Sequence, residues 1–192
     1  MQTREQHNRR EKATSNICTA QALLANMASF FAVYHGEEGL RTIARRTHHM
    51  TAILAAGLTK SGYELAHNSF FDTLTINTGD KSQALYQKAQ SADINLRNLN
   101  TQLGISFDET TTIADIDALF AVFGVNENAK ALSTDISSNE LAAIPETLRR
   151  ETCYLTHPVF NTHHSETQMM RYLKKLENKD FSLTHGMIPL GS

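Results

Sequence analysis

The chain has 192 residues, of which 41% are hydrophobic, enough for one ordinary domain with a buried core and some additional structure. Its net charge of -2 and pI of about 6.5 lack the strong basic excess that is typical of general nucleic-acid binders. The two cysteines, Cys18 and Cys153, lie far apart in sequence, which gives no disulfide framework and favours a reducing compartment. No apolar run reaches the roughly 18 residues that a membrane-spanning helix needs. The sequence thus predicts neither a nucleic-acid partner nor a membrane span.

Two long helices are predicted first, after a charged segment over residues 1–12. From about Ser15 to His35 apolar residues recur at helical spacing, and they occur on more than one side. We therefore expect this helix to be buried on several sides. Gly36 is expected to end it, since glycine is common just beyond helix C-termini. A second helix is predicted from about Glu38 to Leu58, and its core face comprises Leu40, Ile43, Thr47, Met50, Leu54 and Leu58.

The periodicity then changes to that of strands. Residues 72–76 alternate and carry threonines, which predicts a strand. Asp80 is expected to cap a helix from Lys81 to about Ala92. Residues 94–99 and 103–107 alternate again, and the three polar residues between them predict a hairpin.

A further helix is predicted after Thr112, because Thr112 and Asp115 have the spacing of a capping box and Gly124 can close the helix. The order helix, helix, strand, helix, strand, strand, helix is that of an α+β fold. We expect the helices to pack on one face of a small antiparallel sheet.

The remainder of the chain is less regular. Residues 126–156 are interpreted as a helical connector with one short helix near Glu140. A last helix is expected from about Ser165 to Asn178, followed by an extended segment from Phe181 to Ser192. The inward side chains of this last helix are predicted to be Met169, Leu173 and Leu176.

Three sequence blocks carry a resemblance to a known family. The first runs from Arg10 to Gln21 (Arg-Glu-Lys-Ala-Thr-Ser-Asn-Ile-Cys-Thr-Ala-Gln), and the similarity continues through residues 32–58. The second is His157 to Thr167 (His-Pro-Val-Phe-Asn-Thr-His-His-Ser-Glu-Thr), and the third is Met187 to Ser192 (Met-Ile-Pro-Leu-Gly-Ser). In their order and spacing, the blocks resemble the middle of the glycine cleavage system P-protein family, the glycine-decarboxylating dehydrogenases. The chain departs from the family pattern at Glu37 and Gly186.

The resemblance implies an internal fragment of a fold-type-I pyridoxal phosphate enzyme. In the single-chain form two homologous halves are joined, and the second half carries the cofactor lysine. Residues 1–125 resemble the small C-terminal domain of the first, cofactor-less half. Residues 126–156 resemble the connector, and residues 157–192 the opening segment of the second half.

The resemblance also implies a reaction and its partners. Glycine forms an aldimine with pyridoxal phosphate and is decarboxylated, with the cofactor as electron sink. The aminomethyl group then passes to the lipoyl arm of the H-protein. The other implied partners are the remaining P-protein halves or subunits, and the implied location is the bacterial cytoplasm, or the mitochondrial matrix in a eukaryote.

No catalytic residue is expected in this chain, because none of its eight lysines lies in the family's cofactor-lysine motif. We therefore expect that the isolated fragment neither holds pyridoxal phosphate nor turns over glycine.

Several residues are candidate neighbours of the active site in the complete enzyme. Cys18 is either a thiol near the site entrance or a small core residue. Thr14, Ser15 and Asn16 either cap the first helix or present hydroxyls and amides to the neighbouring half.

Histidines supply the other candidates. His163 and His164 are either packing residues or neighbours of the glycine or cofactor site, and His185 and Ser192 flank a segment that leads towards that site in the family. No metal site is expected. His157 could provide a third ligand, but Cys153 and Glu166 have no recognised ligand pattern with it, and the resemblance explains the block without a metal. The adjacent pair His48 and His49 lacks the i, i+4 spacing of a zinc helix and is expected to pack or be solvated.

Two other functions remain open at this point. One is a stand-alone, non-enzymatic interaction module, which would be well folded with closed termini. The other is a small independent α+β enzyme, which would need a pocket where His157, His163 or His164 meets a carboxylate. A non-catalytic segment of a larger decarboxylase, by contrast, predicts a large exposed apolar surface.

Overall fold

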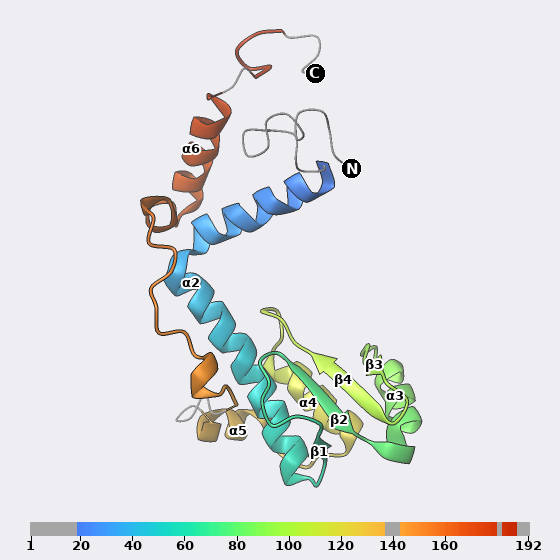
Figure 1. Cartoon of the computed structure of the whole chain (residues 1–192). Helices are drawn as coiled ribbons and strands as arrows, with labels where there is room; N and C mark the ends of the chain where they lie inside the picture. Colours follow the sequence, from blue (N-terminus) through green and yellow to red (C-terminus); the bar gives the residue numbers. More distant parts are fainter. Residues whose placement is uncertain (1–18, 137–142, 180–181, 188–192) are drawn as a thin grey trace, which may run out of the picture. The chain divides into compact units, whose positions relative to one another are not determined.

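The computed structural model describes residues 19–136, 143–179 and 182–187 (Figure 1). The chain forms two compact units. One consists of residues 1–40 together with 153–192, and the other of residues 41–152.

The unit of residues 41–152 is built on a four-stranded antiparallel sheet in the order β1-β2-β4-β3. The strands are β1 (Glu64–Leu65), β2 (Thr73–Asn77), β3 (Arg97–Asn98) and β4 (Gln102–Ser106). The predicted strand and hairpin are thereby confirmed, although β3 has only two residues. The short edge strand β1 was not predicted, because two residues are too few to show an alternation.

One face of this sheet carries the hydrophobic core. In the β2–β4 ladder Leu74 lies opposite Ile105 and Ile76 opposite Leu103, and all four side chains are buried. Successive side chains of a strand point to opposite faces, so these four share a single face. The same core includes Leu54 from α2 (Thr19–Lys60) and residues from α3 (Ser82–Ser91), α4 (Ile113–Phe123) and α5 (Ala129–Ile136). The fold is therefore α+β, with helices packed on a small antiparallel sheet, as expected.

The predicted boundaries of α4 are confirmed. The Thr112 side chain accepts a hydrogen bond from the Asp115 amide, and Asp115 Oδ2 accepts one from the Thr112 amide at 2.7 Å. Gly124 ends the helix in the left-handed conformation, with φ 70°.

The predicted cap of α3 is wrong. Asp80 lies inside a short 3-10 helix, η2 (Gly79–Lys81), and Lys81 is the N-cap residue without a side-chain hydrogen bond. The extra 3-10 turn moves the start of α3 past Asp80. The hydroxyls of Thr78 and Ser82 instead hydrogen-bond to each other across that turn.

Helix α5 was missed by the sequence analysis. Asn128 Oδ1 accepts a hydrogen bond from the Ala131 amide at 2.9 Å, a capping contact, and Ala129 and Leu132 are buried. With only 8 residues, α5 depends on this cap and on tertiary packing rather than on a long periodic pattern. The short helix expected near Glu140 lies outside the described residues. A 3-10 helix, η4 (Glu146–Leu148), follows further on.

The two predicted long helices are joined in α2, which is kinked at Gly36 (φ 61°, ψ -168°). The expected break thus occurs at the expected glycine, although the helix resumes at once. Four of the six predicted core residues of the second part, Thr47, Met50, Leu54 and Leu58, are buried.

The unit of residues 1–40 and 153–192 also contains η5 (Pro158–Asn161) and α6 (Glu166–Glu177). The last predicted helix is confirmed, with Ser165 as N-cap and Asn178 as C-cap. The extended conformation expected after it is wrong for residues 182–185, because they form a turn in which the His185 amide donates to the Ser182 carbonyl at 2.9 Å.

The expected burial of the first helix on several sides is wrong for this chain. Leu24 is 64% exposed, Met27 59% and Phe31 44%. No residue of α6 is buried either, and the inward-predicted Leu173 is 39% exposed. No helix among the described residues is long and apolar enough to span a membrane.

Candidate functional site

His164 is hydrogen-bonded to the kinked part of α2. Its Nδ1 lies 2.8 Å from the carbonyl oxygen of Tyr34. A carbonyl oxygen only accepts, so Nδ1 carries the hydrogen. Because backbone carbonyls at a helix kink lose regular helical geometry, an outside donor at this point stabilises the kink. The contact gives His164 a structural role.

Gly36 is required at the kink for two reasons. Its φ of 61° is a conformation that residues with a side chain rarely adopt. A Cβ atom added there would lie 2.6 Å from Cε1 of His164 and 2.7 Å from the carbonyl oxygen of Phe160. The second histidine block therefore packs directly against the bare backbone of Gly36.

The other histidines of the block make different contacts. The ring of His163 stacks on Tyr172 of α6, with centroids 4.3 Å apart. Nδ1 of His157 accepts a hydrogen bond from the Val159 amide at 3.2 Å and so caps η5. Among the described residues, no carboxylate hydrogen-bonds to any of these three histidines.

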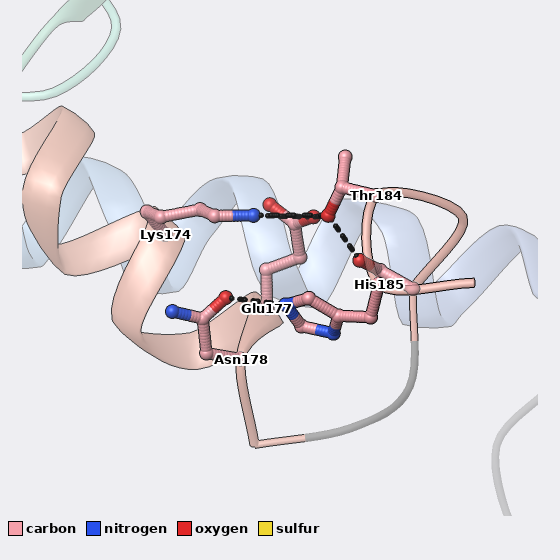
Figure 2. A network of polar contacts seen from close by, with 6 residues as sticks. Lys174, Glu177, Asn178, Thr184 and His185 are labelled. Atoms are coloured by element: carbon pink, nitrogen blue, oxygen red, sulfur yellow. Dashed lines mark hydrogen bonds and ion pairs between the residues drawn. The ribbon is translucent and has the colours of Figure 1, made fainter.

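A polar network fixes the turn after α6 (Figure 2). Nζ of Lys174 donates to Glu177 Oε1 at 3.0 Å and to Thr184 Oγ1 at 3.2 Å. Nε2 of His185 lies 3.1 Å from Asn178 Oδ1, so it carries the hydrogen. The hydrogen bond from Lys174, followed by hydroxyl hydrogen bonds, keeps the pKa of Glu177 below its usual value. The network joins the residues 182–185 to the last turn of α6.

The predicted site residues do not form one cluster in the described structure. His163 and His164 precede α6 and His185 follows it, and a helix of 12 residues is about 18 Å long. Thr14, Ser15, Asn16, Cys18 and Ser192 lie outside the described residues.

Sequence reasoning missed the two features that organise this unit. The Lys174–Glu177 pair has the i, i+3 spacing of helix ion pairs, and could have been found from that spacing. The contact of His164 with Tyr34 joins residues 130 positions apart, and no local pattern encodes it.

His48 is fully buried in the unit of residues 41–152, which confirms that it packs. Its Nδ1 lies 2.8 Å from the Phe71 carbonyl oxygen, and its ring stacks on that of Phe71 at a centroid distance of 5.6 Å. Nε2 has no hydrogen-bond partner among the described residues. His49 is partly buried and pairs with Ser133 Oγ at 2.8 Å.

A cavity of about 560 Å³ lies beside His48. The size is in the range of small-molecule sites. Among the described residues its walls come mainly from alanine and larger apolar side chains, and the charged residues of this lining are Lys60 and Asp135.

This cavity does not fit pyridoxal phosphate. Lys60 is about half exposed and lies 4.0 Å from Glu127 Oε2. It belongs to the last turn of α2, and Asp135 to the last turn of α5. Helix C-termini carry partial negative charge, which disfavours a phosphate. No arginine lines the cavity among the described residues.

The remaining described lysines do not supply a cofactor site either. Each of them is exposed, and Lys88 donates to the Ala121 carbonyl at 2.6 Å. In the described part of the chain no group of three or more His, Cys, Asp or Glu side chains could hold a metal ion.

Comparison with known proteins gives the same assignment over the whole chain. The model of the glycine cleavage system P-protein family matches residues 1–123. Over 192 residues the chain is 85% identical to a glycine dehydrogenase (decarboxylating) of Vibrio vulnificus and 78% identical to one of Vibrio cholerae. A protein of the same name from Photobacterium profundum is 68% identical over 193 residues. Each alignment covers 100% of this chain and 20% of the relative.

The chain thus spans about a fifth of the length of the curated relatives that it matches. The family model covers more than half of the chain, and the similarity to the relatives covers all of it. The chain belongs to the glycine cleavage system P-protein family.

Proposed function

We propose that this chain is a non-catalytic segment of a complete glycine decarboxylase. The observation that carries the proposal is the 85% identity over all 192 residues to a glycine dehydrogenase (decarboxylating) five times its length. The complete enzyme would decarboxylate glycine with pyridoxal phosphate and pass the aminomethyl group to the lipoyl arm of H-protein. Residues 1–125 would form the small C-terminal domain of the first half, 126–156 the connector and 157–192 the opening of the second half.

The cofactor belongs to another part of that enzyme. A Schiff-base lysine needs a sheltered position and a phosphate-binding neighbourhood, whereas the described lysines are exposed and the one beside the cavity lies at a helix C-terminus. The described residues of this chain instead fix the local backbone conformation. Gly36 and His164 set the kink of α2, and the network around Lys174 sets the turn that precedes Ser192.

His163, His164 and His185 stay proposed neighbours of the active site in the complete enzyme, together with Thr14, Ser15, Asn16, Cys18 and Ser192. For the described histidines the support is their placement on two ordered turns that flank α6. The bacterial relatives and the sparse cysteines support a cytoplasmic location for the complete enzyme.

Two observations weigh against the other two functions. The whole chain aligns with only 20% of a glycine dehydrogenase (decarboxylating), which favours a segment of a larger enzyme over a stand-alone interaction module. An independent enzyme built on the histidine block would need a carboxylate beside a histidine, and the described histidines of that block bond to backbone or stack on a ring.

Reconstitution tests the proposal. This chain would be combined with the polypeptides that complete the Vibrio vulnificus relative, with pyridoxal phosphate and H-protein added. The exchange of labelled bicarbonate with the glycine carboxyl group would be measured with and without the chain.

Exchange that depends on the chain is expected. Exchange at the same rate without the chain would contradict the proposal, as would an imine absorption band when the chain alone is mixed with pyridoxal phosphate. A full-length chimera, in which this segment replaces the corresponding 192 residues, controls for failed assembly of the pieces. An inactive but folded chimera would also contradict the proposal.

A further inference from the structure

We propose that the first part of α2 is a permanent docking helix, covered on its large apolar face by the parts of the P-protein chain outside these 192 residues. This inference rests on the proposed function and adds to it the surface through which the segment joins the rest of the enzyme. We call Leu23, Leu24, Met27 and Phe31 the apolar stripe.

The apolar stripe occupies one side of the helix. Its members follow the i, i+3 and i, i+4 spacing that places side chains on one face. They are between 44% and 64% exposed. Four large side chains exposed together on one helix indicate an interaction surface rather than scattered surface residues.

The same helix lacks the charges of a solvated surface. Residues 19–35 contain no aspartate, glutamate, lysine or arginine. A helix that faces water normally carries charged side chains on its outer face. A second side of the helix carries Ala25, Ala28 and Ala32, and small side chains of this kind let another backbone approach closely.

The absence of charge also identifies the kind of occupant. Interfaces that form permanently resemble a protein core, whereas transient interfaces are more polar. An uncharged helix is therefore poorly suited to a partner that binds transiently, such as a carrier of the reaction product. The four-fifths of the relatives' length that lies outside this chain can supply a permanent apolar cover.

The test compares the accessibility of one stripe position in the isolated chain and in the full-length chimera. Both would carry Leu24→Cys, with Cys18, Cys153 and any cysteines of the added parts replaced by Ser. The rate of reaction with a small thiol reagent would be measured, and the same variants in denaturant would give the rate of an uncovered thiol. Ser29→Cys, which is also exposed but lies on the side of the helix opposite the apolar stripe, provides a matched position whose rate should change less between the two forms.

We expect Leu24→Cys to react in the isolated chain within about threefold of the unfolded rate, and at least about tenfold more slowly in the chimera. Equal rates in both forms would overturn the proposal. Slow reaction in the isolated chain at every protein concentration would also overturn it, because this chain would then cover its own helix. Protection that rises with chain concentration would show that a second copy covers the apolar stripe. Protection of the isolated chain by added H-protein would show that H-protein covers it. Either result would overturn the proposal.

This readout needs no catalysis. Exchange activity is therefore measured on the chimera with its own cysteines. If that chimera fails the exchange assay while its Leu24→Cys variant is protected, the docking surface stands and only the proposed function is contradicted. An active chimera in which the Leu24→Cys thiol is not protected would overturn the docking proposal and leave the proposed function intact.

Discussion

His164 donates from Nδ1 to the carbonyl oxygen of Tyr34, across 2.8 Å and 130 positions of sequence. Both residues belong to the unit of residues 1–40 and 153–192. This hydrogen bond holds the histidine block to α2 at its kink. It also explains why a glycine lies two residues after Tyr34, since the ring of His164 occupies the space of a Cβ at Gly36.

Replacing Gly36 by alanine should destabilise this unit by about 2–4 kcal/mol, through the positive φ and the clash with His164 and Phe160 together. The measurement is the free energy of unfolding from denaturant titration. Gly79→Ala is the control, because Gly79 has φ 54° and nothing within 4 Å of an added Cβ. Gly79→Ala should lose only the stability that a side chain at positive φ costs, about 1 kcal/mol. Equal losses in the two variants would show that the space beside Gly36 is open.

Substitutions of His164 should separate a structural role from a catalytic one. Asparagine carries an amide N–H close to the position of Nδ1, so His164→Asn should keep most of the hydrogen bond to Tyr34. His164→Leu should lose it, at a cost of about 0.5–1.5 kcal/mol. In the full-length chimera, exchange activity should follow the same order. If His164→Asn folds like the original but abolishes exchange, the imidazole acts on the chemistry rather than on the kink.

Gly57→Ala should destabilise the core of the unit of residues 41–152, although alanine is the better helix former. A Cβ at Gly57 would lie 2.3 Å from Cζ of Phe120, which is 2% exposed and cannot move away freely. The gain in helix propensity from glycine to alanine is about 1 kcal/mol. Overpacking costs about 1–3 kcal/mol, so the net change should be a loss.

A double-mutant cycle with Phe120→Leu checks this clash. The smaller side chain should remove most of the penalty of Gly57→Ala, which gives a favourable coupling energy between the two positions. Additive losses would mean that the contact with Phe120 does not cause the penalty.

The capping box of α4 should make stability depend on pH. Hydrogen bonds from the Thr112 hydroxyl and amide keep the pKa of Asp115 below its usual value. A carboxyl whose pKa is lower in the folded state stabilises the fold above its unfolded pKa of about 4. That stabilisation is lost as the pH falls from this value through the folded pKa.

Asp115→Asn tests the pH dependence of the cap. The neutral amide can still accept a hydrogen bond, so its contribution should not change with pH. The original protein should be more stable than the variant near pH 7, and the two should converge as the pH falls through the lowered pKa of Asp115 in the folded state. Parallel curves over this range would show that the Asp115 carboxylate adds nothing to the cap.

Local patterns were sufficient for most of the α+β fold. The capping box at Thr112, the alternation from residue 72 to 76 and the break at Gly36 each involve groups only a few residues apart. The cap at Asp80 failed because one 3-10 turn moved the helix start. Helix α5 was missed because it is short and its cap at Asn128 and buried side chains give only a weak periodic pattern.

The sequence by itself determined the family, the order of most of the elements and the absence of charge from the first helix, because these depend on residue types and short spacings. The tertiary structure decided that His164 contacts Tyr34, that His48 is buried, and that the apolar stripe is exposed rather than covered. These outcomes depend on which distant segments meet, and contacts over a hundred residues have no local pattern that encodes them.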